Sequence, residues 1–200
     1  MSMPITYIII AATLLISIAT FNNTELRDKL IFNPFRIAHD REWYRFISAG
    51  FIHADWLHLI VNMFVLYMFG IVVEQYLALY SFKLPKVNFL LLYFVSLVLS
   101  SVSTFYKYKH TALYNSLGAS GAVSGLLFAF VVFAPTQEIC LYGILCLPGW
   151  AWLPIYIFYS TYMAKQGRDN INHDAHLWGG IVGALYVIVQ QPTLITRWFN

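Results

Sequence analysis

Charged side chains are scarce in this sequence, and their scarcity indicates the solvent in which the chain folds. Asp, Glu, Lys and Arg make up 10% of the 200 residues, and hydrophobic residues make up 60%. In soluble proteins about a quarter of the residues are charged. The mean hydropathy of +0.65 points the same way. The composition therefore excludes an ordinary soluble domain and predicts a protein with several membrane-spanning helices.

Basic clusters and cysteines are also lacking. The net charge is only +3, and Lys and Arg are scattered without a basic block, so nucleic acid is not an expected partner. Cys140 and Cys146 are the two cysteines, and both lie in one apolar stretch. We expect them to be small buried hydrophobic residues rather than part of a disulfide framework or a zinc site. No metal and no cofactor is expected.

Apolar runs near the length of about 20 residues that crosses a bilayer occur repeatedly along the chain. The first has no basic leader and no A-x-A cleavage site, so we expect a retained helix rather than a signal peptide. Pro148, Gly149 and Pro154 interrupt a later run, so its helix should begin near Trp150. Six spans are predicted, with both termini on one side: approximately 4–20, 56–79, 87–106, 117–134, 150–163 and 175–190.

Residues 25–49 mix charged and apolar side chains, unlike the spans on either side. Pro34 excludes one continuous helix through this segment. Its aromatic side chains can enter lipid while Arg36, Arg41 and Arg45 reach water or headgroups. The segment is predicted to be a structured loop that lies partly in the membrane.

Three of the spans carry the polar side chains of interest, which are costly in lipid and so mark candidate functional sites. His58 and Asn62 are four residues apart and share one helix face. Residues 118–125 form a run of small residues that includes Ser120. A helix face made of small residues lets a second helix approach closely.

His176 opens the sixth span and is followed by Gly179, Gly180 and Gly183 at helical spacing. These glycines could pack against residues 118–125 and bring His176 towards Ser120. A serine hydroxyl needs a base to become a nucleophile, and an imidazole with a pKa near 6.5 suits that role.

Each feature also has a purely structural explanation. Small-residue runs more often serve helix packing alone, and Ser124 is assigned to packing. His58 and Asn62 could be an interhelical hydrogen-bonding pair, and Glu74 a structural acceptor. The remaining histidines could be solvated loop residues: His39, His53, His110 and His173. The functional explanation gains weight because Ser120, His176 and the pair His58 and Asn62 all lie near the helix ends of one side.

Together these residues resemble the rhomboid intramembrane serine proteases. The resemblance covers nearly the whole chain, and the order and spacing of its motifs are specific. The matching residues are Glu42-Trp43-Tyr44-Arg45, His53, His58-x-x-x-Asn62-Met63, Glu74, Gly118-Ala119-Ser120-Gly121 and Ala175-His176-x-x-Gly179-x-x-x-Gly183.

The resemblance implies a single domain over residues 1–200, an all-α bundle of six transmembrane helices with a membrane-embedded first loop. It implies an endopeptidase that cleaves transmembrane protein substrates within the lipid bilayer, in or near their spans. Ser120 would be the nucleophile and His176 the general base and acid, a dyad without a carboxylate. The Ser120 backbone N–H and the side chains of His58 and Asn62 would stabilise the oxyanion. Arg45 and Glu74 would brace the first loop and the helix ends.

Two features depart from the family pattern. The residue four positions after the nucleophile is often an aromatic that packs on the histidine, but here it is Ser124.

The second departure concerns orientation. The family implies a bacterial inner-membrane protein whose site opens to the extracytoplasmic side, whereas the positive-inside rule places the first, third and fifth loops in the cytoplasm. We follow the family, because the first loop is expected to be folded. Those loops hold Arg27, Lys29, Arg36, Arg41, Arg45, Lys107, Lys109, Lys165 and Arg168, against Lys83, Lys86 and Arg197 elsewhere.

A transporter or channel is the main alternative, with His58, Asn62 and His176 along a proton or solute path. Such a protein has no need of Ser120. A metal-dependent protease is a weaker alternative, because the histidines lack the H-E-x-x-H arrangement.

Overall fold

The computed structural model describes residues 3–141, 144–166, 172–196 and 198. Its first half contains α1 (Ile5–Phe21), α2 (Thr24–Leu30), α3 (Pro34–Asp40), α4 (Arg45–Ser48), the 3-10 helix η1 (Ala49–Phe51), α5 (Trp56–Leu79) and α6 (Pro85–Ser100). Its second half contains α7 (Val102–Tyr108), α8 (Ser120–Phe133), β1 (Glu138–Leu141), β2 (Leu145–Pro148), α9 (Gly149–Gln166), α10 (His173–Gln190) and α11 (Thr193–Thr196).

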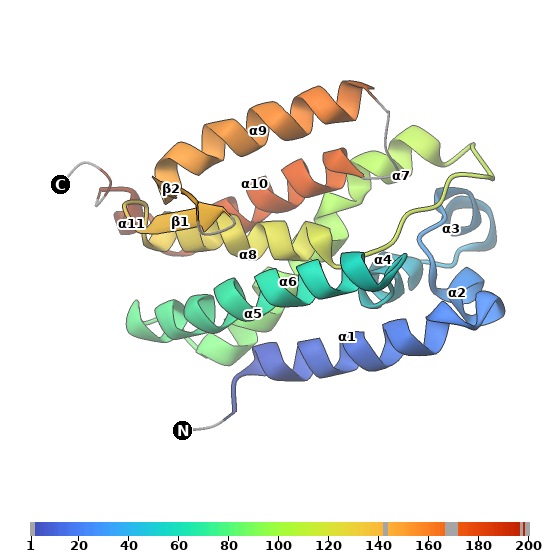
Figure 1. Cartoon of the computed structure of the whole chain (residues 1–200), viewed down its shortest axis with the longest axis horizontal. Coiled ribbons are helices and arrows are strands. Elements are labelled where there is room, and N and C mark those ends of the chain that lie inside the picture. The colour runs from blue at the N-terminus through green and yellow to red at the C-terminus, as the bar shows by residue number, and fades with distance from the viewer. Residues whose placement is uncertain (1–2, 142–143, 167–171, 197, 199–200) are drawn as a thin grey trace.

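The long helices lie side by side in a bundle (Figure 1). The short helices α2, α3, α4 and α7 gather at one end, and the β1–β2 hairpin and α11 lie at the other. A helix occurs at each of the six predicted places, with α6 and α7 together covering the third. By length and composition, Trp56–Leu79 and Pro85–Tyr108 are long and apolar enough to cross a membrane, and α1 and α8 are apolar but shorter.

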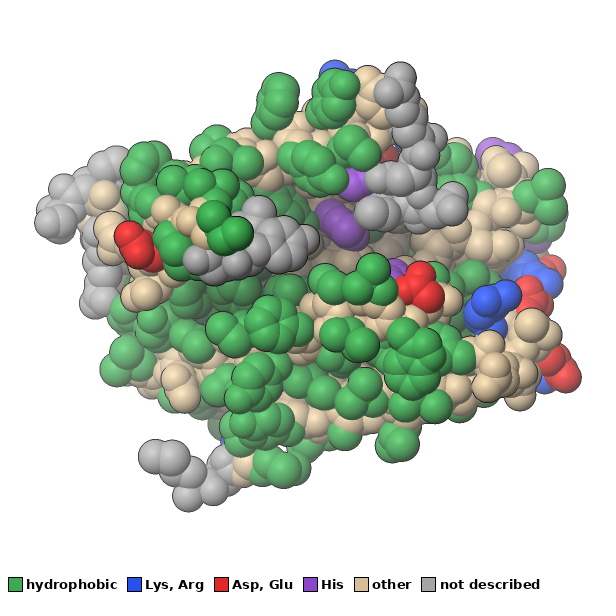
Figure 2. All heavy atoms as spheres, viewed as in Figure 1, with side chains coloured by type: hydrophobic (Ala, Val, Ile, Leu, Met, Phe, Trp, Pro, Cys, Tyr) green, Lys and Arg blue, Asp and Glu red, His purple; other side chains and the backbone are tan. Residues whose placement is uncertain are grey.

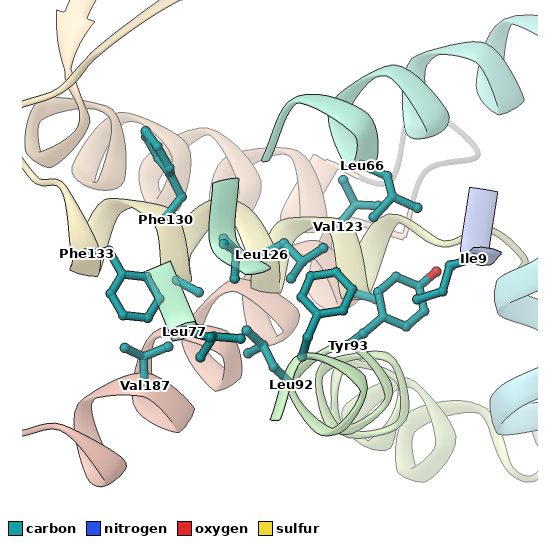
Figure 3. Close-up of a cluster of buried hydrophobic side chains, with 14 of the residues drawn as sticks. Ile9, Leu66, Leu77, Leu92, Tyr93, Val123, Leu126, Phe130, Phe133 and Val187 are labelled. Carbon is teal, nitrogen blue, oxygen red and sulfur yellow. The ribbon is translucent and has the colours of Figure 1, made fainter. Parts of the chain in front are cut away.

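Helix α8 lies at the centre of the bundle. Every residue of α8 except Ser120 and Leu127 is buried. A helix that is hydrophobic on all sides belongs in the interior, so its composition explains its place. Figure 3 shows the cluster around it: Val123, Leu126, Phe130 and Phe133 of α8 with Ile9, Leu66, Leu77, Leu92, Tyr93 and Val187 from the surrounding helices.

Glycines bring α8 and α10 into backbone contact, as the sequence predicted. A Cβ atom on Gly179 would lie 2.9 Å from the Cα of Gly121, and one on Gly183 would lie 2.5 Å from the Cα of Gly125. Ordinary contacts between carbon atoms are about 3.5–4.0 Å, so neither position has room for a side chain. These contacts fix the position of α10 along the axis of α8, and therefore the relative positions of the first turns of the two helices.

The loop between α1 and α5 is folded, which confirms the prediction of a structured segment. Arg45 lies at its centre, where Nη1 donates to the carbonyl oxygens of Asp28 and Ile31, both at 2.7 Å, and Nε donates to Glu42. The expectation that Arg45 reaches water is wrong, because its guanidinium is buried among these acceptors. The expectation that it braces the loop is confirmed.

The two cysteines form a disulfide, so the prediction that they are buried thiols is wrong. Strands β1 and β2 pair in antiparallel fashion with Cys140 opposite Cys146, and the bond joins the two strands. Both residues are exposed. The apolar stretch folds back on itself as a hairpin, and this reversal brings the cysteines together. Helix α9 then begins at Gly149, one residue before the predicted start, and continues through Pro154.

The contact between α8 and α10 generates a stability prediction. Replacing Gly183 with Ala places a methyl group against the backbone of Gly125, and the helices must separate. We expect the free energy of unfolding in detergent micelles to fall by about 1–3 kcal/mol.

Val189→Ile is the matched control, because it adds one methyl group to the same helix at a position that is 76% exposed. Its effect should stay within about 0.5 kcal/mol. Equal stability of Gly183→Ala and the parent would show that the backbone contact does not limit the approach of the two helices.

Candidate active site

Ser120 is the first residue of α8, and a glycine with a positive φ leads into it. Gly118 has a φ of +119°, a conformation that L side chains rarely adopt, and its N–H donates to the carbonyl of Ala49 at 2.9 Å. A Cβ atom at Gly118 would lie 2.9 Å from Nε2 of His58 and 3.9 Å from Oγ of Ser120. The absence of a side chain at Gly118 therefore leaves room for the imidazole of His58 on the side of the chain where the Ser120 hydroxyl also lies.

His58 belongs to the first turn of α5 and presents one edge to Gly118. Asp55 caps the helix by accepting from the N–H of His58 at 2.8 Å, and Nδ1 of His58 accepts a long hydrogen bond of 3.5 Å from the N–H of Ala54. A neutral imidazole that accepts at Nδ1 carries its proton on Nε2. The edge of His58 near Ser120 is thus a hydrogen-bond donor.

Asn62 follows one turn later on the same face and is buried. Its Nδ2 donates to the carbonyl of His58 at 2.9 Å, within its own helix. A primary amide has two N–H donors, and this bond engages one of them. The prediction that His58 and Asn62 share a helix face is confirmed, and their joint role towards an oxyanion stays a prediction.

His176 lies in the first turn of α10. Asn172 caps this helix, since its Oδ1 accepts from the N–H of Ala175 at 3.1 Å and its carbonyl accepts from the N–H of His176 at 3.2 Å. Asn172 is itself held by α7, through a bond of 3.0 Å from Nδ2 to Oγ1 of Thr104. The position of His176 is therefore set by the Asn172 cap of α10 and by the bond of that cap to α7.

Ser120 and His176 lie at adjacent ends of α8 and α10. The Cβ position of Gly121 is 3.6 Å from the carbonyl oxygen of Ala175, which precedes His176. Ser120 and Ala175 also line one cavity of about 30 Å³, which is large enough for a water molecule. Figure 2 shows a hollow on this face of the molecule, between α5 and α9, with histidine side chains in it.

Carboxylates near the site have other partners. Oδ2 of Asp174 pairs with Nζ of Lys107 at 3.4 Å, and the expectation that Asp174 does not orient His176 stays a prediction. Glu74 accepts from the N–H groups of Ile5 and Thr6 at 3.0 and 2.6 Å, and thereby caps α1 as the predicted structural acceptor. Among the described residues, no group of three or more His, Cys, Asp or Glu is placed to hold a metal ion.

His53 is fully buried, so the expectation of a solvated loop residue is wrong. Its Nε2 accepts from the N–H of Ala119 at 3.4 Å, and its Nδ1 lies 3.0 Å from Oγ of Ser17, which donates to the carbonyl of Phe51. A neutral ring with its proton on Nδ1 satisfies the whole chain of bonds. Burial, with a smaller contribution from His58, lowers the pKa of His53 from 6.5 to about 3.

His173 is also buried, at 4% exposure, which corrects the same expectation. His39 and His110 are exposed, as expected. The sequence contained a signal for His173, because it lies three residues before His176 and so shares its helix face. For His53 the sequence offered only its place among the residues that match the family, without a spacing that predicts its burial.

Comparisons with known proteins agree with the motifs. Residues 40–192 match the sequence model of the Rhomboid domain family. The chain is 29% identical over 166 residues to "Rhomboid-like protein 11, chloroplastic" of Arabidopsis thaliana, covering 72% of this chain and 51% of that protein. It is 30% identical over 145 residues to "Rhomboid protein 1, mitochondrial" of Saccharomyces cerevisiae, covering 70% and 40%. It is 29% identical over 157 residues to "Putative rhomboid protease YdcA" of Bacillus subtilis, covering 75% and 69%. The chain spans about half the length of the first two relatives.

The bonds of His53 generate a pH prediction. His53 lies in the loop before α5, and its pKa is about 3 in the folded protein against 6.5 as the ordinary value. Between these values the unfolded chain binds more protons, so the free energy of unfolding should fall as the pH falls, by at most about 1.4 kcal/mol per pH unit. Unfolding measured at pH 7.5 and pH 5 in detergent tests this.

His53→Gln removes the titrating group and should flatten this dependence. His110→Gln, at an exposed position, is the control and should leave it unchanged. If the slope is the same in the parent and in His53→Gln, the protonation of His53 is not coupled to folding.

Proposed function

The chain belongs to the rhomboid family, and from this premise we propose that it is an intramembrane serine endopeptidase that cleaves peptide bonds in or near the transmembrane segments of other membrane proteins. One observation carries the proposal: Ser120 begins α8, the donor edge of His58 and Oγ of Ser120 both lie within 4 Å of the Cβ position of Gly118, and His176 lies in the first turn of α10 at the same end of the bundle. The transporter alternative is not favoured, because the similar proteins are rhomboids and one is named a protease.

The proposed reaction is acyl transfer through Ser120. Oγ of Ser120 attacks the substrate carbonyl while His176 takes its proton, and the imidazolium then protonates the leaving amine as the peptide C–N bond breaks. A water molecule, deprotonated by His176, attacks the acyl-enzyme and releases the new carboxyl end and free Ser120. The cavity that Ser120 and Ala175 share could admit that water.

The tetrahedral intermediate needs hydrogen-bond donors that are already in place. The N–H of Ser120 belongs to the first turn of α8, where N–H groups have no partner within the helix and the helix dipole favours negative charge. We assign it to the oxyanion site together with Nε2 of His58 and the amide of Asn62. Loss of one such donor typically slows the chemical step about 100-fold to 1,000-fold.

The proposed dyad works without a carboxylate. Asp174 is engaged by Lys107, and Glu74 caps α1 at the opposite end of α5 from His58. Packing and the cap of α10 contribute to the orientation of His176. No cofactor enters this scheme.

The protein is an integral membrane protein, and we propose that the whole chain is one domain of six spans. The support is a helix at each of the six places and the exposure of large apolar side chains on α5, such as Leu57, Ile60 and Phe64, which suit contact with lipid. The folded first loop would lie partly in the membrane. Substrates would be spans weakened by Gly, Pro or small residues, because attack needs an extended backbone at Ser120.

We propose a bacterial inner membrane, with the site open to the extracytoplasmic side. The named relatives come from chloroplasts, mitochondria and a bacterium, so the compartment is part of the proposal. The Lys and Arg residues of the first loop would oppose this orientation if the loop were a simple connector. Instead, Lys29 pairs with Glu25, Arg36 pairs with Asp28 and Arg45 is buried, so these cations belong to a folded element.

Removing either member of the dyad should abolish proteolysis. Ser120→Ala and His176→Ala are each expected to cleave a single-span model substrate at least about 1,000-fold more slowly than the parent in detergent. Ser120→Ala should also lose covalent labelling by a fluorophosphonate. His39→Ala and His110→Ala are controls at exposed positions and should cleave as the parent does. A folded Ser120→Ala protein that retains parental cleavage would overturn the proposal.

The orientation can be tested with the two cysteines. The disulfide-bonded hairpin follows the end of α8 remote from Ser120, so in the proposed orientation it faces the cytoplasm. In bacterial cells that express the chain, a membrane-impermeant reductant followed by a membrane-impermeant maleimide should leave Cys140 and Cys146 unlabelled, and a permeant reductant followed by a permeant maleimide should label both. Labelling of both cysteines by the impermeant pair would show the opposite orientation.

A further inference from the structure

The residue one turn after the proposed nucleophile has no aromatic ring to pack on the catalytic base. One turn after Ser120 the residue on this helix is Ser124, and its hydroxyl bonds to the phenol oxygen of Tyr156 on α9 at 2.7 Å. A general base must keep its ring within hydrogen-bond reach of the hydroxyl it deprotonates. Rings of α10 and α9 lie near His176 instead.

Two aromatic rings extend from His176 towards α9. The ring of His173 meets the ring of His176 edge to face, with centroids 5.8 Å apart and an interplanar angle of 67°. The ring of Tyr159 meets His173 in the same manner, at 5.7 Å and 84°. Edge-to-face pairs at these distances are favourable, and burial of His173 keeps water from competing with them.

We propose that His173 and Tyr159 are positioning residues that hold the imidazole of His176 in the orientation needed to deprotonate Ser120. This inference rests on the proposed function. His173 acts on the rotamer of His176, since the two residues are one turn apart on one face of α10. Tyr159 acts on His173 from the neighbouring helix. Neither residue needs to touch the substrate.

The same face of α9 supplies the other contacts that hold this helix over the site. Tyr156, Tyr159 and Ser160 are spaced as one helix face, and Ser160 is buried. The ring of Tyr156 packs edge to face on Phe128 of α8 at 5.3 Å. Most other side chains of α9 are exposed or half-buried. The position of α9 over α8 is therefore linked to the orientation of His176.

The test compares loss of a ring with its conservative replacement. His173→Ala and Tyr159→Leu should lower kcat for a transmembrane substrate, by about 10-fold or more for His173→Ala, and leave KM near the parental value. A misplacement of about 1 Å in a catalytic group can cost about 100-fold. His173→Phe and Tyr159→Phe keep the rings and should restore most of kcat. The rate of fluorophosphonate labelling at Ser120 should follow kcat.

Tyr162→Leu is the matched control, because Tyr162 lies on α9 and is 52% exposed, as is Tyr159, but stacks on Phe158 instead. It should leave kcat unchanged. If His173→Ala does not fold, Tyr159→Leu and the two Phe variants still decide. The inference is overturned if kcat of the folded ring-loss variants stays within twofold of the parent, or if the Phe variants are as slow as the ring-loss variants. A parent that neither cleaves nor labels at Ser120 would overturn the proposed function itself.

Discussion

Backbone contact between α8 and α10 is the constraint on which the rest of the molecule depends. Gly179 and Gly183 meet Gly121 and Gly125 so closely that no side chain fits at the interface. In lipid, apolar surface alone does not drive helices together, and close backbone packing supplies the attraction instead. The two glycine pairs lie one turn apart, and together they set the register between α8 and α10. That register places the first turns of both helices side by side, where Ser120 and His176 are found.

Polar side chains complete the bundle by joining helices that glycine does not join. Glu74 of α5 caps α1, and His53 connects Ser17 of α1 to the backbone of Ala119 just before α8. The hydroxyl of Tyr186 on α10 donates to Asn88 of α6 at 2.7 Å. An unpaired polar group is costly in an apolar interior, so each of these bonds penalises displacement of its helix.

The sequence predicted those features that depend on local spacing and failed on those that depend on chain reversal. The interval between Gly179 and Gly183 predicted the contact with residues 118–125, and the breakers around Gly149 predicted the start of α9 to within one residue. The pairing of Cys140 with Cys146 depends on a hairpin that apolar composition cannot reveal. The burial of His53 depends on Ser17 and Ala119, which are distant in sequence and carry no mark of that contact. Family resemblance implied that Ser120 and His58 act together, and the absence of a side chain at Gly118 leaves room for His58 on the side of Ser120.

Burial separates the polar residues that hold the fold from those we assign to catalysis. Ser17, His53 and Ser124 are buried and use their polar atoms on neighbouring helices. Ser120, His58 and His176 are half-buried at the first turns of three helices, where a substrate backbone could reach them. A nucleophile needs both properties: a dry, rigid surround that strengthens its electrostatic partners, and an open edge for the reacting carbonyl. In this bundle the half-buried first turns of the three helices combine the two. The glycine contact that brings the ends of α8 and α10 together therefore accounts for the position of the proposed site.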